Sequence, residues 1–522
     1  MHYRPIAPPS FALLILLLLS TWAGARAQAQ PTFEVQLPDD LATPATGRLV
    51  VYLIREGSQV ERRSPADGPF WTDPQPLYGM DLEAVAGGTT VKIHPDAAFP
   101  DAFPAPPAEL AAGKYRAQAT LDLSRLDSSF GREGGNRIGE PVAFEVRPGE
   151  SVAVTLGLEN TVPNWEYRSR GGEEFVIESE LLGAFHNGRP IELKAGVIPP
   201  IDYDPQKQYA AVYSIPGFGG RHDGGRYGAQ WNEVRKRAFI IQLDSESPNG
   251  HTLFCDSRVN GPYAQALIEE LIPELEARYP LISEPWARLV TGHSSGGWAS
   301  LWLGTQYPDT FGATWSSGPD PVDFRRFELV DIYSDDNAYV RDGEELPAAR
   351  FEVDGKMQVT MSVREENGGE GVLGPLNTSG QQWDSWMACW GTPDENNPRI
   401  EPGDWPVAKP VFDAETGDLD HEEAKAYEAY DIRLLLSQDP ERYLPVFENQ
   451  IRLVCGAVDN YYLDEAVRLL MTELQKQGFD ESGSGYVKLI EGADHGRSLF
   501  VSEAMRAWPG EMAEHLKANG ME

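Results

Sequence analysis

Hydrophobic residues follow two different rhythms along the chain, and the first extends from residue 31 to about residue 165. In this part, short runs of β-forming residues alternate with polar ones and are separated by clusters of Pro, Gly and Asp. A period of two is typical of strands that bury one face. We therefore predict an all-β, sandwich-like domain over residues 28–170 and leave open whether it binds carbohydrate or acts as a scaffold. The clearest runs are 47–55, 114–123, 142–146 and 151–159.

The second rhythm alternates buried strands with helices and covers residues 171–522. Continuous apolar runs that are too short for helices mark the strands. The clearest helix is 261–280, where the apolar residues form one stripe and Pro273 can introduce a kink. This alternation predicts a mostly parallel sheet with helices on both faces. The expected strands are 209–217, 237–243, 287–292, 311–319, 449–459 and 485–496, and the stripe consists of Ala264, Leu267, Ile268, Leu271 and Leu275.

The N-terminus has the features of a secretory signal peptide. Arg4 supplies positive charge, residues 11–20 are an apolar core that is too short to span a bilayer, and Ala25 and Ala27 fit a cleavage site. We predict cleavage near Ala27 and a secreted or periplasmic protein without stable membrane insertion. An uncleaved membrane anchor is the alternative.

Charge and cysteine content exclude several classes of partner and cofactor. The formal net charge of -36 repels nucleic acid and anionic lipid, so we expect no nucleic-acid partner.

Among the three cysteines, Cys455 lies in an apolar run and fits a buried side chain. Whether Cys255 and Cys389 form a disulfide is left undecided by the sequence. The sequence has no metal-ligand spacing and no nucleotide-binding motif, so we expect neither metal nor cofactor.

Residues 292–296, Gly-His-Ser-Ser-Gly, fit the nucleophile elbow G-x-S-x-G between a buried strand and a helix. In such an elbow a serine occupies a strained turn, and the flanking positions have no room for side chains. The register selects Ser294 and not Ser295, because an elbow centred on Ser295 would need glycine where the chain has His293.

A nucleophilic serine needs a base and an acid, which follow it along the chain in this architecture. His495 follows the last expected strand, and Asp459 follows the strand before it. Both therefore come to the sheet edge where open α/β sheets build their sites. We predict that His495 is the base and Asp459 the acid. The competing acids are Asp464, Glu491 and Asp494.

Backbone N–H groups that stabilise an oxyanion should come from the glycine-rich loop 216–220 and from the residue after the nucleophile. We expect the donors to be the N–H groups of Phe218 and Ser295, with Gly219 as the alternative to Phe218.

The motifs PGFGG (216–220), NGPYAQALIEELIPELEARYP (260–280), TGHSSGGWAS (291–300), GAVDNYYL (456–463) and GADHG (492–496) together resemble the putative-esterase family of α/β-hydrolases. This family includes feruloyl, acetyl-xylan and enterochelin esterases, S-formylglutathione hydrolases and mycolyltransferases. The resemblance covers roughly residues 205–325 and 445–500. It implies the α/β-hydrolase fold, with nucleophile, acid and base at Ser294, Asp459 and His495. Pro216 departs from the family, in which many members have His at that position.

The long segment between Ser294 and Asp459 suggests that residues 330–445 form a lid or insertion. Its tryptophans can stack on sugars or aryl groups, or can form the core of the lid itself. We keep three of them as candidate substrate-binding residues. The tryptophans are Trp383, Trp386, Trp390 and Trp405, and the candidates are the first three.

These features predict an exported serine carboxylesterase that acts through an acyl-enzyme. The expected substrate is a small-molecule or carbohydrate ester, such as acyl groups on polysaccharide or aryl esters. The alternatives are an acyltransferase on the same site and a non-catalytic carbohydrate-binding or envelope protein on a hydrolase core. The sequence does not fix the oligomeric state.

Overall fold

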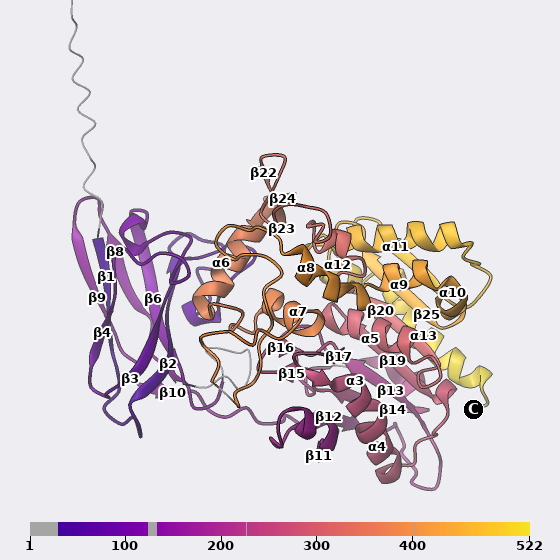
Figure 1. The fold of residues 1–522 in the computed structure, drawn as a ribbon. Coiled ribbons are helices and arrows are strands. Elements are labelled where there is room, and N and C mark those ends of the chain that lie inside the picture. Colours follow the sequence, from indigo (N-terminus) through magenta and orange to yellow (C-terminus); the bar gives the residue numbers. More distant parts are fainter. Residues whose placement is uncertain (1–29, 124–132, 226, 402, 522) are drawn as a thin grey trace, which may run out of the picture.

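The chain folds into a β-rich N-terminal part and an α/β part, which lie side by side in the computed structural model (Figure 1). The structure describes residues 30–123, 133–225, 227–401 and 403–521. The signal peptide predicted for residues 1–27 lies outside the described residues. Within the described ranges, no helix has the length and apolar character needed to cross a membrane.

The N-terminal part consists of two facing sheets. Its strands are β1 (Gln30–Gln36), β2 (Ala45–Arg55), β3 (Leu77–Val85), β4 (Thr90–Ile93), β5 (Ala102–Phe103), β6 (Gly113–Asp122), β7 (Arg137–Ile138), β8 (Val142–Val146), β9 (Ser151–Leu156) and β10 (Asn160–Thr161). One sheet has the order β4-β1-β9, and the other has the order β10-β7-β6-β2-β3-β5 with β8 beside β6. Phe33 of the first sheet and Leu49 of the second belong to one buried cluster. The β-sheet content predicted for this part is therefore present.

Strand β2 has apolar residues on both faces because each face is covered. Leu49 and Val51 belong to the core between the two sheets. Val50 and Tyr52 point the other way and are buried with Val372 at the end of helix α6 (Val363–Leu373). The continuous apolar run of β2 therefore attaches the N-terminal sheets to the rest of the chain.

The α/β part is built on a mostly parallel sheet with the order β11-β12-β14-β13-β19-β20-β25-β26. Its strands are β11 (Glu173–Glu178), β12 (Glu192–Ile198), β13 (Ala210–Ile215), β14 (Ala238–Leu243), β19 (Arg288–His293), β20 (Ala313–Ser317), β25 (Ile451–Gly456) and β26 (Tyr486–Ile490). Strand β12 is antiparallel to both neighbours, and the strands from β14 to β26 are parallel. The predicted fold class, a mostly parallel α/β sheet after an all-β domain, is confirmed.

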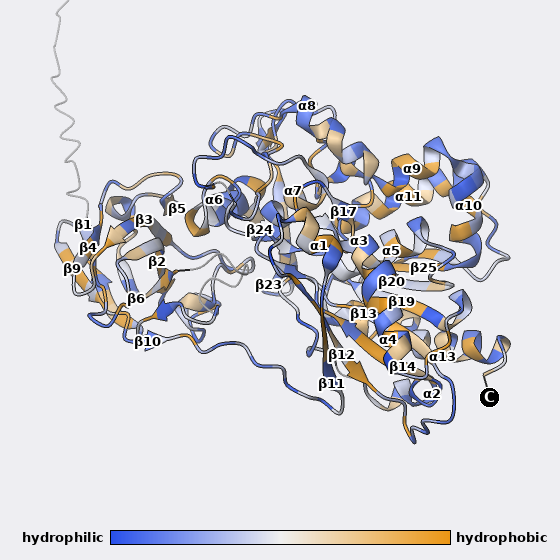
Figure 2. Cartoon of the chain, turned by 60° about the horizontal axis from the view of Figure 1, so that its bottom comes forward, coloured by the Kyte–Doolittle hydropathy of each residue, from blue (hydrophilic) through white to orange (hydrophobic). Residues whose placement is uncertain are grey.

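Helices cover both faces of this sheet, and its strands β13 and β14 are coloured mostly hydrophobic in Figure 2. The helices are α1 (Glu180–Phe185), α2 (Asn232–Arg235), α3 (Tyr263–Ala266), α4 (Ile272–Arg278), α5 (Ser295–Gln306), α11 (Leu463–Gln477), α12 (Arg497–Phe500) and α13 (Glu503–Ala518). Val290 of β19 packs in the cluster that contains Leu303 of α5. Its neighbour Leu289 packs in the opposite cluster, with Met512 of α13.

The helix predicted at 261–280 forms in three consecutive pieces. Helix α3 continues into a π-helical turn, Leu267–Leu271, and then into α4. Pro273 lies in the first turn of α4, where its missing N–H leaves one helical hydrogen bond unmade. A π-helical turn adjusts the backbone next to such a defect.

The segment between β20 and β25 carries its own elements and joins the two parts of the chain. They are β21 (Val340–Arg341), β22 (Glu344–Glu345), β23 (Pro347–Val353), β24 (Lys356–Ser362), α6, α7 (Gln382–Trp390), α8 (His421–Ala424), α9 (Ile432–Gln438) and α10 (Pro440–Asn449). Ser362 and Glu365 form a capping box at the start of α6. Arg48 of β2 donates to the Val372 carbonyl at 3.0 Å.

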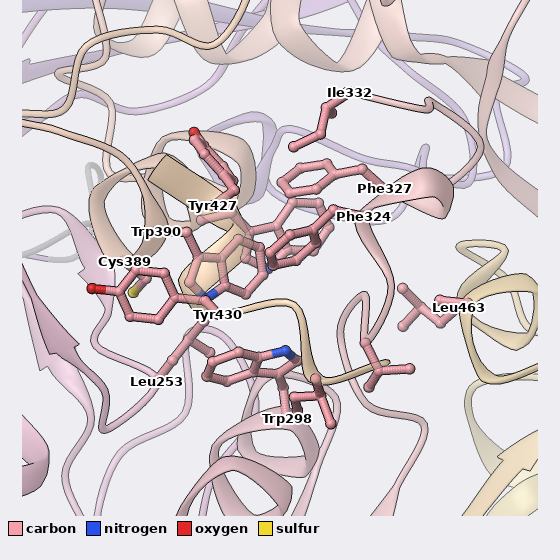
Figure 3. Packing of buried hydrophobic residues seen from close by; sticks show 14 of the residues in the cluster. Leu253, Trp298, Phe324, Phe327, Ile332, Cys389, Trp390, Tyr427, Tyr430 and Leu463 are labelled. Carbon is pink, nitrogen blue, oxygen red and sulfur yellow. The ribbon is translucent and has the colours of Figure 1, made fainter. Parts of the chain in front are cut away.

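An aromatic cluster anchors this segment to helix α5. Figure 3 shows Trp298 of α5 facing Trp390 of α7, and their ring centroids are 5.1 Å apart. Phe324 and Phe327 lie on the other side of Trp390, with centroids 4.6 and 5.5 Å from it. Buried aromatic pairs of this kind contribute about 0.5–1.5 kcal/mol each beyond the area that they bury.

The thiols of Cys255, Cys389 and Cys455 are all buried and free in the part of the chain that the structure describes. The Cys455 side chain is fully buried, as the apolar run around it predicts. Cys255 and Cys389 lie close enough to interact through their thiols.

Candidate active site

Ser294 occupies the tight turn between β19 and α5. Its φ of 60° and ψ of -125° are unusual for a residue with a side chain. A Cβ on Gly292 would lie 2.0 Å from the carbonyl oxygen of Gly296, and a Cβ on Gly296 would lie 2.3 Å from that of Ile215. Glycine is therefore required on both sides of the serine by close packing.

His495 and Asp459 meet through a short hydrogen bond at the carboxyl ends of β26 and β25. His495 Nδ1 lies 2.7 Å from Asp459 Oδ2. The Tyr461 N–H donates to Asp459 Oδ1 at 2.9 Å, and the His495 N–H donates to Asn460 Oδ1 at 3.0 Å. Asp459 is fully buried. The bond from Tyr461 holds its carboxylate in place, and the bond between the carboxylate and Nδ1 orients the imidazole ring.

Burial and the neighbouring charges act in opposite directions on His495. Burial alone would lower the pKa of His495, but the carboxylate of Asp459, helped by Asp320 and Asp494, raises it above its ordinary value. The imidazolium that forms when a histidine accepts a proton is therefore stabilised here.

The competing acids are engaged elsewhere or are exposed. Asp464 forms ion pairs with Arg350 at 3.0 Å and with Arg468 at 3.2 Å. Asp494 accepts hydrogen bonds from the hydroxyl and N–H of Ser498. Glu491 is exposed. Of these carboxylates, the structure places Asp459 against His495.

Ser294 and His495 line the same cavity, which has a volume of about 280 Å³. Its walls come from the sheet edge, from the segment between β20 and β25, and from the N-terminal part. The lining residues are Trp71, Gly217, Phe218, His293, Ser294, Asp320, Glu328, Glu366, Gln382, Trp386, Tyr461, Leu463 and His495.

The glycine-rich loop lies beside the serine. The Gly220 N–H donates to the Gly217 carbonyl at 3.0 Å, which closes a tight turn with Gly219 at a φ of 69°. Gly217 and Phe218 line the cavity, whereas Gly219 is not among its lining residues. Ser295 is the first residue of α5, where N–H groups have no acceptor within the helix. A Cβ on Gly217 would lie 3.3 Å from the Cβ of Ser294, so the loop packs directly against the serine.

The candidate tryptophans separate into two groups. Trp386 lines the cavity and donates from Nε1 to Asp320 Oδ2 at 2.6 Å. Trp383 and Trp390 belong to the aromatic core and do not line the cavity. Trp405 stacks on His186 at 3.8 Å between centroids and does not line it either. Substrate contact is therefore retained for Trp386 only, because Trp383 and Trp390 are covered by their neighbours.

Sequence reasoning missed several residues of the cavity wall. Asp320, Glu328 and Glu366 carry buried carboxyl groups, and burial raises the pKa of Asp320 to about 6 despite the bond from Trp386. Trp71 reaches the cavity from the N-terminal part. Nothing in the local sequence around these residues marks them, since they meet only through the fold.

A second histidine shows that a carboxylate partner alone does not define the site. His222 Nδ1 lies 2.7 Å from Asp244, and its Nε2 lies 2.9 Å from Glu174. His222 does not line the cavity of Ser294. It connects Glu174 of the edge strand β11 with Asp244, which follows β14, and packs against Trp165, whose ring centroid is 5.0 Å away.

Residues 190–416 match the family described as Putative esterase. The matched range includes Ser294 and the loop 216–220, and it ends before Asp459 and His495. No curated protein matches the chain.

Several solved structures are similar to the chain at low identity. An S-formylglutathione hydrolase from Agrobacterium tumefaciens is 14% identical with a TM-score of 0.39, covering 67% of this chain and 97% of its own. A CE1 ferulic acid esterase from Anaeromyces mucronatus, solved with ferulic acid, is 14% identical with a TM-score of 0.32, covering 68% and 93%. FphF, a fluorophosphonate-binding serine hydrolase from Staphylococcus aureus, is 11% identical with a TM-score of 0.36, covering 66% and 98%.

Proposed function

We propose that the α/β domain of this chain belongs to the putative-esterase family of α/β-hydrolases. On this premise, the protein is an exported serine carboxylesterase that works through Ser294, His495 and Asp459. The observation that carries the proposal is the convergence of three features. Ser294 lies on a positive-φ elbow, His495 shares its cavity, and Asp459 lies 2.7 Å from His495.

In the proposed reaction, Ser294 attacks the ester carbonyl while His495 Nε2 accepts the hydroxyl proton. Asp459 holds Nδ1 and stabilises the imidazolium. The N–H groups of Phe218 and Ser295 donate to the oxyanion of the tetrahedral intermediate. His495 then protonates the leaving alcohol, and water attacks the acyl-enzyme by the same steps.

The cavity wall supports an aromatic or sugar-bearing ester as substrate. Trp71, Phe218, Trp386 and Tyr461 place aromatic rings around Ser294. A cavity of about 150 Å³ holds benzene, so about 280 Å³ accommodates an aryl group together with its ester. Aryl esters and acyl groups on polysaccharide are therefore the substrates to test first.

A fluorophosphonate probe, which reacts with activated serines, tests the proposal. We expect the wild type and Ser295→Ala to be labelled and Ser294→Ala to remain unlabelled. With a panel of aryl and sugar esters, Ser294→Ala should lower turnover by at least about three orders of magnitude. Labelling of Ser294→Ala, or equal turnover by both proteins, would contradict the proposal.

The same panel separates hydrolysis from acyl transfer. With an added alcohol acceptor, an esterase should release mainly the free acid, whereas an acyltransferase should form mainly the new ester. Export is tested separately by N-terminal sequencing of the protein from the periplasm or medium, where we expect Gln28 as the first residue.

A further inference from the structure

Three buried carboxyl groups share the cavity with Ser294. Asp320 follows β20, Glu328 lies in the loop after it, and Glu366 lies in the first turns of α6. Besides Tyr461, the other ionisable groups among the described lining residues are the imidazoles of His293 and His495, and this lining includes no Lys or Arg. The wall is therefore acidic without a permanent cation to balance it.

One oxygen of the Glu328 carboxyl group lacks a donor among the described residues. Its side chain is 1% exposed, and no N–H or hydroxyl donates to its Oε2 in the part of the chain that the structure describes. Within the described ranges, the carboxyl group of Glu328 pairs with the carboxyl group of Glu366. A buried acceptor without a donor costs about 1–3 kcal/mol. Such a group in a cavity wall indicates a ligand that supplies the donor.

Glu366 is the better stabilised member of the pair. Trp71 Nε1 donates to Glu366 Oε1 at 2.9 Å, and Trp383 Nε1 donates to Oε2 at 3.2 Å. Burial and the neighbouring Glu366 together raise the pKa of Glu328 well above its ordinary value. Burial raises the pKa of Glu366 as well, so the two carboxyl groups in contact share a proton, and a bound cation favours the ionised form of the pair.

The surroundings oppose ionisation of the pair as long as no cation is bound. Glu370 and Asp320 both raise the pKa of Glu328 electrostatically. No group of three or more His, Cys, Asp or Glu within the described ranges is arranged to hold a metal ion. The aromatic rings of Trp71, Trp386 and Tyr461 line the same cavity, and aromatic faces attract organic cations.

We propose that this cavity recognises esters that carry a protonated amine, and that the amine binds against the Glu328–Glu366 pair. This inference rests on the proposed esterase function, because it names the substrate class of the same site. The ammonium N–H donates to Glu328 and its charge balances the pair, while anionic esters are repelled. A substrate that carries hydroxyl groups but no amine would supply the hydrogen-bond donor for Glu328 but not the positive charge.

Competitive inhibition of p-nitrophenyl acetate hydrolysis tests the inference with probes of equal length. At constant ionic strength near neutral pH, n-butylammonium should inhibit at least about tenfold more tightly than n-butanol, and butyrate should inhibit more weakly than either. In Glu328→Gln and in Glu366→Gln the preference for the ammonium over the alcohol should largely disappear. The control Glu344→Gln, which alters an exposed acid in β22, should keep the full preference.

Two results would overturn the inference: equal inhibition of the wild type by butylammonium and butanol, or a preference that persists in both carboxamide variants. Fluorophosphonate labelling of Ser294 in each variant shows that its site is folded. If the wild type neither hydrolyses p-nitrophenyl acetate nor labels, the proposed function fails instead. Titration calorimetry with the two probes then measures the ammonium preference without turnover, and equal affinities would overturn the inference as well.

Discussion

Trp71 of the N-terminal part donates a hydrogen bond from its indole Nε1 to Glu366 at 2.9 Å, across 295 positions of the chain. Its backbone carbonyl in turn accepts a bond from the hydroxyl of Thr360 in β24 at 2.9 Å. The loop before β3 is thus tied to the segment between β20 and β25 at the cavity. The N-terminal sheets therefore contribute to the wall beside Ser294 and are more than a distant module.

Removal of this indole should weaken substrate binding. We expect Trp71→Ala to raise KM for aryl esters about tenfold with a smaller effect on kcat, because a wall contact is made in both ground and transition states. Trp71→Phe keeps a ring without the N–H and should recover most of the KM. Steady-state kinetics on the ester panel measures both. An unchanged KM in Trp71→Ala would show that the wall does not contact substrate.

The pKa of His495 makes a signed prediction about pH. A base must be neutral to accept a proton, so kcat/KM should rise with pH through the pKa of His495. Since Asp459 raises that pKa, the inflection should lie above the ordinary histidine value of about 6.5.

The variant Asp459→Asn tests whether the inflection belongs to His495 or to Asp320, whose pKa is about 6, because Asp459 is the strongest group that raises the pKa of His495 and only a minor influence on that of Asp320. Loss of the carboxylate should move the inflection to lower pH and should reduce kcat by roughly 10⁴-fold. An inflection that stays in place in Asp459→Asn would assign the titration to another group.

Close packing at the elbow predicts a loss of stability. In Gly296→Ala the new methyl would meet the carbonyl oxygens of Ile215 and Pro216 at 2.3 and 2.5 Å. We expect a loss of at least about 1–3 kcal/mol in the free energy of unfolding, together with most of the activity. The control Gly510→Ala lies in α13 with no atom within 4 Å of the new Cβ, and should be neutral or stabilising by up to about 1 kcal/mol. Denaturant unfolding of both variants measures the difference.

Trp390 and Trp386 should respond differently to substitution. Trp390 is fully buried in the aromatic core, so Trp390→Ala should cost about 3–5 kcal/mol of stability. Trp386→Phe keeps most of the packing and removes the bond to Asp320. Its main effect should appear in the pH profile and KM, since the pKa of Asp320 rises further without the N–H. Equal stability losses in the two variants would contradict this division.

Much of the fold can be predicted from local patterns in the sequence. The run 142–146 matches β8 (Val142–Val146), and the strands on either side of Ser294 follow their apolar runs closely. Such runs report burial, which is a property of each segment. The order of the strands and the antiparallel edge at β11 and β12 depend on partners far along the chain, and periodicity does not reveal partners.

The candidate site can likewise be predicted from the sequence only in part. The elbow at Ser294 and the strand ends before Asp459 and His495 follow from local motifs and chain order. The role of Trp71 and the pairing of Glu328 with Glu366 do not, because these residues come from separate elements. Trp383 and Trp390 could not be distinguished from Trp386 by sequence, since all three lie on one helix and only packing decides which of them reaches the cavity.

The convergence of Ser294 and His495 is tested most directly by the rate of a single covalent event. Mass spectrometry of peptides after reaction with a fluorophosphonate locates the adduct, and a time course in the wild type and His495→Ala gives the rate. We predict an adduct on Ser294 that forms at least about three orders of magnitude more slowly in His495→Ala. An adduct on Ser295, or equal rates in the two proteins, would contradict a serine activated by His495.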